Sequence, residues 1–187
     1  MSDSAQKTLQ VAYFSMEIMM ESDIPSYAGG LGVLAGDLLR SCADMEVPAV
    51  GVSLVYSGST SRQIINPDGS QSFKETEWQK LDQLVKLPNR IQITIQNTDI
   101  WVDCWRYDMV GQTLFNVPVY LLDTDIPENP DWARNITQNL YGGDGETRVC
   151  QEILLGIGGV QMLRNLGYQD IQMFHLNEPE ILHNNPF

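Results

Sequence analysis

A glycine-rich stretch, YAGGLGVLAGD at residues 27–37, carries the strongest chemical signal in the sequence. Gly29, Gly30 and Gly32 have no Cβ atom, so the backbone there can approach a bound group closely. If a helix begins at this turn, the free N–H groups of its first turn direct positive dipole toward an anion. The turn has neither the Gly-Lys-Ser/Thr of a Walker loop nor the GxGxxG spacing of a dinucleotide site. Two interpretations stay open: an anion or sugar-phosphate site, or glycines needed only for a tight turn and helix packing.

A second candidate is the block HLNE at residues 175–178, which comes at the end of an expected short strand from Ile171 to His175. Ligands of open α/β sheets bind at the carboxyl ends of strands, so His175, Asn177 and Glu178 are candidate contacts. A lone histidine carries little information, and a packed or capping His175 is the alternative.

The elements before and after the glycine stretch predict how it is positioned. Apolar runs at Leu9–Ser15 and Ala49–Tyr56 read as buried strands, and the segment between them reads as a helix. Strand, helix and strand in this order predict a βαβ unit with a parallel sheet. The apolar residues of this helix recur at three- and four-residue steps and are expected to face inward: Leu31, Leu34, Leu38, Cys42 and Met45.

Further along, the pattern indicates an excursion from the sheet and a return to it. Residues 57–87 are loosely patterned, with a tight turn at Asn66-Pro67-Asp68-Gly69. Alternating residues from Ile91 to Trp105 predict an antiparallel hairpin, turning at residues 97–99, at an edge or as an insert. Phe115–Leu122 then resumes strand character.

A long helix is expected from Glu146 to about Asn165, with Asp144 as its N-cap. Three glycines in its middle, Gly156, Gly158 and Gly159, each cost up to about 1 kcal/mol relative to alanine. Close packing on the sheet is the preferred reason for them, and a local break is the other. A further helix is expected to open at Asn177-Glu178-Pro179.

Composition excludes several classes of partner. The 187 residues include 24 acidic and 11 basic ones, a net charge of -13, which opposes contact with nucleic acid or anionic lipid. The sequence contains neither a signal peptide nor an apolar run long enough to span a membrane, so we expect a cytoplasmic protein. Three scattered cysteines fit packed reduced thiols, and two histidines offer little for a metal site.

Five blocks, in their order along the chain, resemble those of the bacterial-type α-glucan (glycogen and maltodextrin) phosphorylases: VAYFSMEI, YAGGLGVLAGD, DTDIPEN, YGGDGETRVCQEILLGIGGV and HLNE. The resemblance covers almost the whole chain. It implies an α/β fold, a three-layer Rossmann-like parallel sheet with a β-hairpin excursion, as the N-terminal half of a two-lobed GT-B glycosyltransferase. Residues 1–187 are then expected to form a single partial domain without the C-terminal lobe that binds pyridoxal phosphate.

The resemblance also implies an activity and a set of site residues. The activity is that of a hexosyltransferase, the phosphorolysis of α-1,4-glucan to glucose 1-phosphate with retained configuration, with pyridoxal phosphate acting through its phosphate. The amides of Gly29, Gly30 and Leu31 would lie beside the substrate and cofactor phosphates. Glu17 would line the glucose subsite, its alternative being a solvated carboxylate after a strand, and His175, Asn177 and Glu178 would also contact substrate.

The sequence departs from the family at its end. Pro179 and Glu180 stand where the family has Gly-His, whose histidine touches glucose, and we expect a truncated or frameshifted copy. The family's Schiff-base lysine lies in the other half of the polypeptide, so the chain alone is expected to be inactive. The four lysines of this chain are expected to be solvated surface residues: Lys7, Lys74, Lys80 and Lys86.

Two other functions compete with this one. The first is a non-catalytic carbohydrate-binding or regulatory remnant, whose exposed surface favours a homo-oligomer. The second is the N-terminal half of a glycogen or starch synthase, which shares a Gly-Gly-Leu-Gly loop. The missing lysine before that loop and the YGGD block argue against the synthase.

Overall fold

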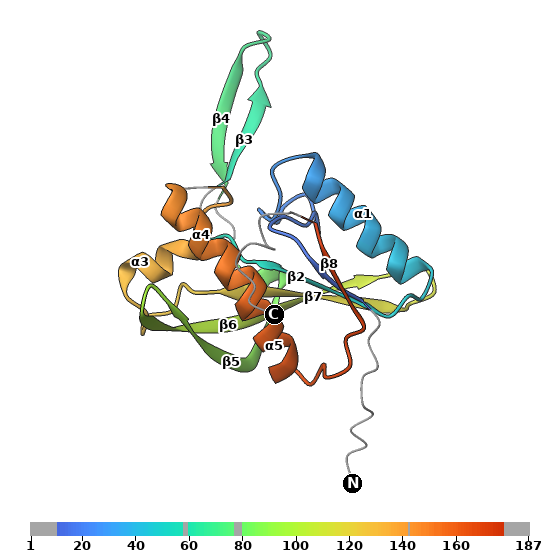
Figure 1. Ribbon diagram of the computed structural model, residues 1–187. Coiled ribbons are helices and arrows are strands. Elements are labelled where there is room, and N and C mark those ends of the chain that lie inside the picture. The colour runs from blue at the N-terminus through green and yellow to red at the C-terminus, as the bar shows by residue number, and fades with distance from the viewer. Residues whose placement is uncertain (1–10, 58–59, 77–79, 142, 178–187) are drawn as a thin grey trace.

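The computed structural model describes residues 11–57, 60–76, 80–141 and 143–177. A six-stranded sheet in the order β5-β6-β7-β2-β1-β8 forms its centre (Figure 1). Four of these strands are mutually parallel: β1 (Val11–Phe14), β2 (Ala49–Leu54), β7 (Asn116–Asp123) and β8 (Met173–Leu176). The mostly parallel α/β sheet expected from the sequence is confirmed.

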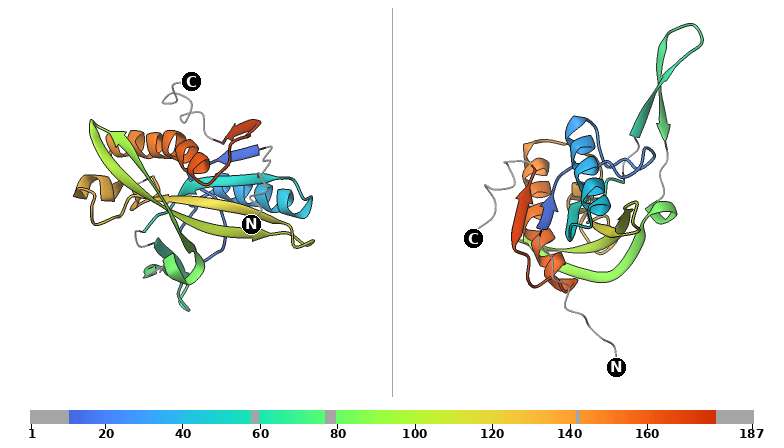
Figure 2. Two further views of the ribbon diagram at one scale, coloured as in Figure 1. Left: turned by 90° about the horizontal axis from the view of Figure 1, so that it is seen from below. Right: turned by 90° about the vertical axis from the view of Figure 1, so that its right-hand side faces the viewer.

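Helices cover both faces of the sheet, as the two further views in Figure 2 show. Helix α1 (Gly30–Asp44) packs on one face with the apolar cluster that includes Tyr13 and Val119. The helical segment at residues 145–165 packs on the other face with the cluster that includes Phe14 and Val52. All six residues of β2 are buried because it is covered on both sides. The βαβ unit of β1, α1 and β2 is confirmed.

The buried face of α1 is not the expected one. Its buried residues are Gly32, Ala35, Gly36, Leu39 and Ala43. Leu31, Leu34 and Met45 are 46%, 56% and 68% exposed, so the prediction that they face inward is wrong. A Cβ atom on Gly36 would lie 2.2 Å from the carbonyl oxygen of Met19. The helix lies so close to the backbone before it that only small residues fit in the contact.

The second long helix runs without a break through its glycines. It consists of α4 (Gly145–Ile153), a π-helical turn η2 (Leu154–Gly158) and α5 (Gly159–Asn165). A Cβ atom on Gly159 would lie 2.6 Å from the ring of Phe14, so close packing on the sheet is confirmed. The π-helical turn is the local irregularity. Asp144 is confirmed as the N-cap, since its Oδ1 accepts from the N–H of Thr147 at 3.0 Å.

The expected hairpin is formed by β5 (Val85–Ile95) and β6 (Thr98–Val110), which extends the sheet antiparallel to β7. It turns at Gln96 and Asn97, both with positive φ, and the turn predicted at residues 97–99 overlaps this turn at Asn97. A separate hairpin of β3 (Thr60–Ile65) and β4 (Gln71–Thr76) projects from the body of the molecule (Figure 1). Its turn at residues 66–69 is the one predicted.

Three short elements complete the fold: α2 (Lys80–Gln83), α3 (Asp131–Arg134) and the 3₁₀ turn η1 (Asn135–Thr137). Cys42, Cys104 and Cys150 are free thiols, as predicted. Within the described ranges, no helix is long and apolar enough to cross a membrane.

Candidate functional site

The candidate site lies at the carboxyl edge of the parallel strands. Because β1, β2, β7 and β8 run in one direction, their carboxyl ends share one edge of the sheet. Helices α1 and α4 follow strands of this set and begin at that edge, on the side of the molecule from which the β3–β4 hairpin projects (Figure 1). Two helix N-termini and the segments after β1 and β8 therefore meet where ligands of such sheets bind.

Asn177 joins the ends of β8 and β1. Its backbone N–H donates to the carbonyl oxygen of Phe14 at 2.9 Å, and its side-chain Nδ2 donates to Oγ of Ser15 at 3.2 Å. Ser15 in turn donates to the carbonyl oxygen of Glu17 at 2.7 Å. Asn177 thus holds the strand ends together, and its predicted contact with substrate stays a prediction.

Glu17 connects β1 to the glycine stretch. Its side chain is buried, with the residue only 2% exposed. Oε2 accepts from the N–H of Ala28 at 2.8 Å and of Gly29 at 3.2 Å, and Oε1 accepts from the hydroxyl of Tyr141 at 2.8 Å. Three donors offset the cost of burying this charge. The alternative of a solvated carboxylate is wrong, and Glu17 braces the loop at the start of α1.

The glycines of the loop divide into two kinds. A Cβ atom on Gly32 would lie 2.4 Å from Cβ of Tyr27 and 2.9 Å from Oε2 of Glu17, so this glycine is required for packing. Cβ atoms on Gly29 and Gly30 would meet nothing within 4 Å. The packing interpretation therefore holds for Gly32, while Gly29 and Gly30 are open and their role in an anion site stays a prediction.

The open glycines lie at the N-terminus of α1. The N–H of Gly29 is donated to Glu17, which leaves the amides of Gly30 and Leu31 as the ones best placed for a ligand. The N-cap residue Gly29 has no side chain that could accept a hydrogen bond from the first turn of this helix. An uncapped helix start with open glycines is suited to an anion.

His175 lies on β8 directly opposite Tyr13 of β1. The two rings are stacked, with centroids 4.8 Å apart and planes at 22°. His175 is also exposed to solvent. The structure thus gives His175 a packing partner while leaving it accessible. Glu178, the last of the predicted site residues, lies outside the described residues.

Tyr141 was not singled out from the sequence. It has φ 55°, a left-handed conformation, and its hydroxyl reaches Glu17 from the segment that precedes α4. The guanidinium of Arg148 lies 4.7 Å from the centre of its ring, and Nε of Arg148 donates to Oε1 of Glu152 at 3.2 Å. The block YGGDGETR contains Tyr141, but its sequence signal indicates only a turn and a helix start.

A second buried carboxylate, Asp123, lies at the end of β7. It pairs with Nζ of Lys80 at 2.6 Å and accepts from Nε1 of Trp105 at 2.9 Å. The side chains of Lys80 and Asp123 are 17% and 4% exposed, so the prediction that Lys80 is a solvated surface lysine is wrong. Lys80 neutralises this buried carboxylate, and the sequence pattern around Lys80 does not show where the chain returns to the sheet.

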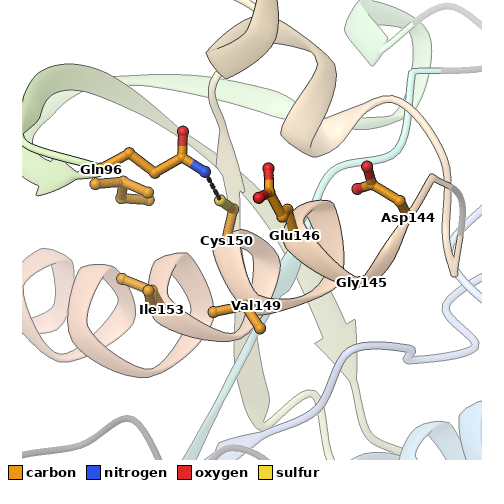
Figure 3. Close-up of a pocket in the computed structure, with 8 residues that line it drawn as sticks. Gln96, Asp144, Gly145, Glu146, Val149, Cys150 and Ile153 are labelled. Atoms are coloured by element: carbon orange, nitrogen blue, oxygen red, sulfur yellow. Dashed lines mark hydrogen bonds between the residues drawn. The ribbon is translucent and has the colours of Figure 1, made fainter.

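A groove of about 590 Å³ lies between the β5–β6 turn and α4 (Figure 3). Ile95, Val149 and Ile153 provide apolar surface, while Asp144 and Glu146 add carboxylates. Nε2 of Gln96 lies 3.9 Å from Sγ of Cys150, and burial raises the pKa of that thiol. None of the site residues predicted from the sequence lines this groove.

Known proteins with similar sequences include two α-glucan phosphorylases. The chain is 41% identical over 183 residues to the glycogen phosphorylase of Mycobacterium tuberculosis, and 35% identical over 175 residues to the maltodextrin phosphorylase of Thermococcus litoralis. The resemblance to the α-glucan phosphorylases is confirmed. The matches cover 94% and 90% of this chain but only 20% of each phosphorylase. No family model matches the chain.

A solved structure with low sequence identity to this chain has a similar fold. The catalytic domain of starch synthase IV from Arabidopsis thaliana, bound to ADP and acarbose, is similar with a TM-score of 0.59 and 12% sequence identity. The similarity covers 90% of this chain and 28% of the synthase chain. At this identity it shows the fold alone, and it agrees with the expected half of a two-lobed GT-B glycosyltransferase. The phosphorylase resemblance and the fold together indicate a glycosyltransferase-type protein.

Proposed function

We propose that this chain supplies the glycine-loop wall of an α-1,4-glucan phosphorylase site. The observation that carries the proposal is the Glu17-braced loop, which presents Gly30 and Leu31 at the uncapped N-terminus of α1. That loop lies in a chain 41% identical to a glycogen phosphorylase. The partners are then α-1,4-glucan and inorganic phosphate, in a cytoplasmic protein whose free thiols fit a reducing compartment.

Pyridoxal phosphate fits this chain in one respect and not in another. The open space around Gly29 and Gly30 and the amides at the start of α1 are suited to a phosphate group. The described lysines whose side chains are placed, Lys80 and Lys86, pair with Asp123 and Asp103 and are not free to form a Schiff base. When bound, the cofactor supplies a phosphate that exchanges a proton with inorganic phosphate.

The residues of this chain act by binding and orientation. The amides of Gly30 and Leu31 hold an anionic oxygen, and the dipole of α1 favours the negative charge. Glu17 keeps the loop in place because its carboxylate accepts hydrogen bonds from two loop amides and from the hydroxyl of Tyr141. These use three of the about four hydrogen bonds that a carboxylate can accept. His175, Asn177 and Glu178 are proposed to contact the sugar from the end of β8.

The domain assignment and the competing functions belong to the same proposal. Residues 1–187 form one partial domain, the N-terminal lobe, and activity requires the other lobe. The exposed Leu31, Leu34 and Met45 on α1 support the expected self-association. The synthase alternative has support from the fold of starch synthase IV, but 41% identity to a glycogen phosphorylase outweighs 12% identity to that synthase.

A titration followed by NMR tests the proposed anion site. Glucose 1-phosphate and inorganic phosphate are added separately to the ¹⁵N-labelled chain, and we expect the largest shifts at Gly30 and Leu31. Gly30→Pro removes one amide donor at the first helical position, where proline is tolerated, and should weaken binding. Gly145→Pro makes the same change at the first position of α4 and should not. Shifts absent from Gly30 and Leu31, or equal losses in both variants, would refute the site.

A second measurement tests incompleteness. The chain mixed with maltodextrin, inorganic phosphate and pyridoxal phosphate should release no glucose 1-phosphate. Turnover that depends on the added cofactor would show that the chain alone is sufficient.

A further inference from the structure

A line of polar side chains runs across the carboxyl edge of the sheet, from α4 on one face to the loop before α1 on the other. Glu152 holds Arg148, Arg148 lies over the ring of Tyr141, and the hydroxyl of Tyr141 donates to Glu17. Glu17 then accepts from the amides of the glycine loop. The two helical layers are thus joined at the point where the candidate anion site lies.

Tyr141 is held in an uncommon backbone conformation. A tyrosine with φ 55° lies in the left-handed region, which costs a non-glycine residue on the order of 1 kcal/mol. Gly143 also has a positive φ, 86°, and Asp144 caps α4. Strained residues persist where the surroundings determine them, and they concentrate at functional sites.

The hydroxyl of Tyr141 satisfies an atom that would otherwise lack a donor. Both loop amides donate to Oε2 of Glu17, and Oε1 receives its hydrogen bond from Tyr141. Leaving one oxygen of a buried carboxylate without a donor is costly, and the carboxylate would have to rotate or move toward water. Either movement lengthens the bonds to Ala28 and Gly29.

We propose that Tyr141 is a positioning residue for the anion site. It fixes Glu17, Glu17 fixes the amides of Ala28 and Gly29, and these set the direction of the amides of Gly30 and Leu31 that follow. The inference rests on the proposed function for the identity of the ligand. The segments before α4 and before α1 then order the site together. A change at Tyr141 therefore alters phosphate binding although Tyr141 does not contact the phosphate.

Tyr141→Phe tests the proposal, with Tyr107→Phe as a matched control. Tyr107 also donates its hydroxyl to a glutamate, Oε1 of Glu21 at 2.6 Å, but on an exposed surface. Amide hydrogen exchange in Tyr141→Phe should accelerate about fivefold at Ala28 and Gly29, the equivalent of one hydrogen bond. Exchange at Val50 and Val52 in β2 should stay unchanged, and Tyr107→Phe should change none of these four amides.

Binding provides the readout that a merely structural contact would not move. The affinity for glucose 1-phosphate, followed at Gly30 and Leu31, should fall about fivefold in Tyr141→Phe. Tyr107→Phe should bind as the unsubstituted chain does.

The outcomes separate this inference from the proposed function. Unchanged exchange at Ala28 and Gly29, or acceleration that is equal in β2, would overturn the role of Tyr141. Local acceleration with an unchanged affinity for glucose 1-phosphate would also overturn it. If the unsubstituted chain binds neither phosphate nor glucose 1-phosphate while the local acceleration is seen, the brace is supported and the proposed function fails.

Discussion

Gly32 and Glu17 are in contact across the start of α1: a Cβ atom on Gly32 would lie 2.9 Å from Oε2 of Glu17. The same atom would lie 2.4 Å from Cβ of Tyr27. The bare backbone at Gly32 therefore makes room for the carboxylate that binds the loop amides. Gly32 is therefore required for the position of Glu17, and this requirement does not depend on contact with a ligand.

Gly32→Ala is expected to lower the free energy of unfolding by about 1–3 kcal/mol, because the added methyl group forces the loop and Glu17 apart. Gly30→Ala is the matched control, since its Cβ would meet nothing within 4 Å, and it should change stability by less than about 1 kcal/mol. Urea unfolding of both variants checks this. Equal losses would show that alanine disturbs the helix start itself and not its contact with Glu17.

The sequence predicts α1 as an element but not the face it buries. Leu31, Leu34 and Leu38 have helical spacing, but so does the row of small residues at Gly32, Ala35 and Gly36. A periodic pattern does not show how near the opposing backbone lies, and here that distance selects the small residues. The existence of a helix is a local property, while its inward face depends on tertiary contact.

The same distinction applies to the candidate site. The βαβ order places Glu17, the glycine loop and Asn177 at one edge of the sheet, and the structure brings them together. Tyr141 could not be found this way, because its contact with Glu17 joins residues 124 positions apart and depends on a left-handed backbone. No local pattern predicts such a pairing.

Asp103 is expected to make stability depend on pH in the acid range. Burial raises the pKa of its carboxyl, but hydrogen bonds from Arg90 and Lys86 outweigh burial and lower the pKa below its usual value. A carboxyl with a lowered pKa in the folded state stabilises the protein above its unfolded pKa of about 3.9, and the stabilisation is lost as pH falls through the folded pKa.

Asp103→Asn tests this assignment through unfolding measured between pH 7 and pH 2.5. The gap in stability between the original chain and the variant should be largest at neutral pH and should close below about pH 4. Asp37→Asn removes a more distant and more exposed partner of Arg40 and should leave the acid limb unchanged. A gap that stays constant with pH would contradict the ion pair.

Of the three thiols, only Cys42 is expected to react readily in the folded protein. Cys42 is half-buried, while Cys104 and Cys150 are buried. Burial, with a contribution from Asp103, raises the pKa of Cys104 to about 12, so this thiol is not ionised at pH 8. With a colorimetric thiol reagent at pH 8 we expect one reactive thiol, identified as Cys42 by peptide mapping, and three in denaturant. Early labelling of Cys104 would contradict the buried hairpin.

Lys80→Met is expected to destabilise the protein by about 3 kcal/mol, because it removes the cation paired with the buried carboxylate of Asp123. Lys86→Met is the matched control. Lys86 is half-exposed, and its partner Asp103 keeps Arg90, so the loss should stay below about 1 kcal/mol. Thermal and urea unfolding of both variants measure the difference. The double variant Lys80→Met with Asp123→Leu should recover stability relative to Lys80→Met alone, since the unpaired charge is removed; a further loss would mean that Asp123 is held by Trp105 and its other donors, and not by the lysine.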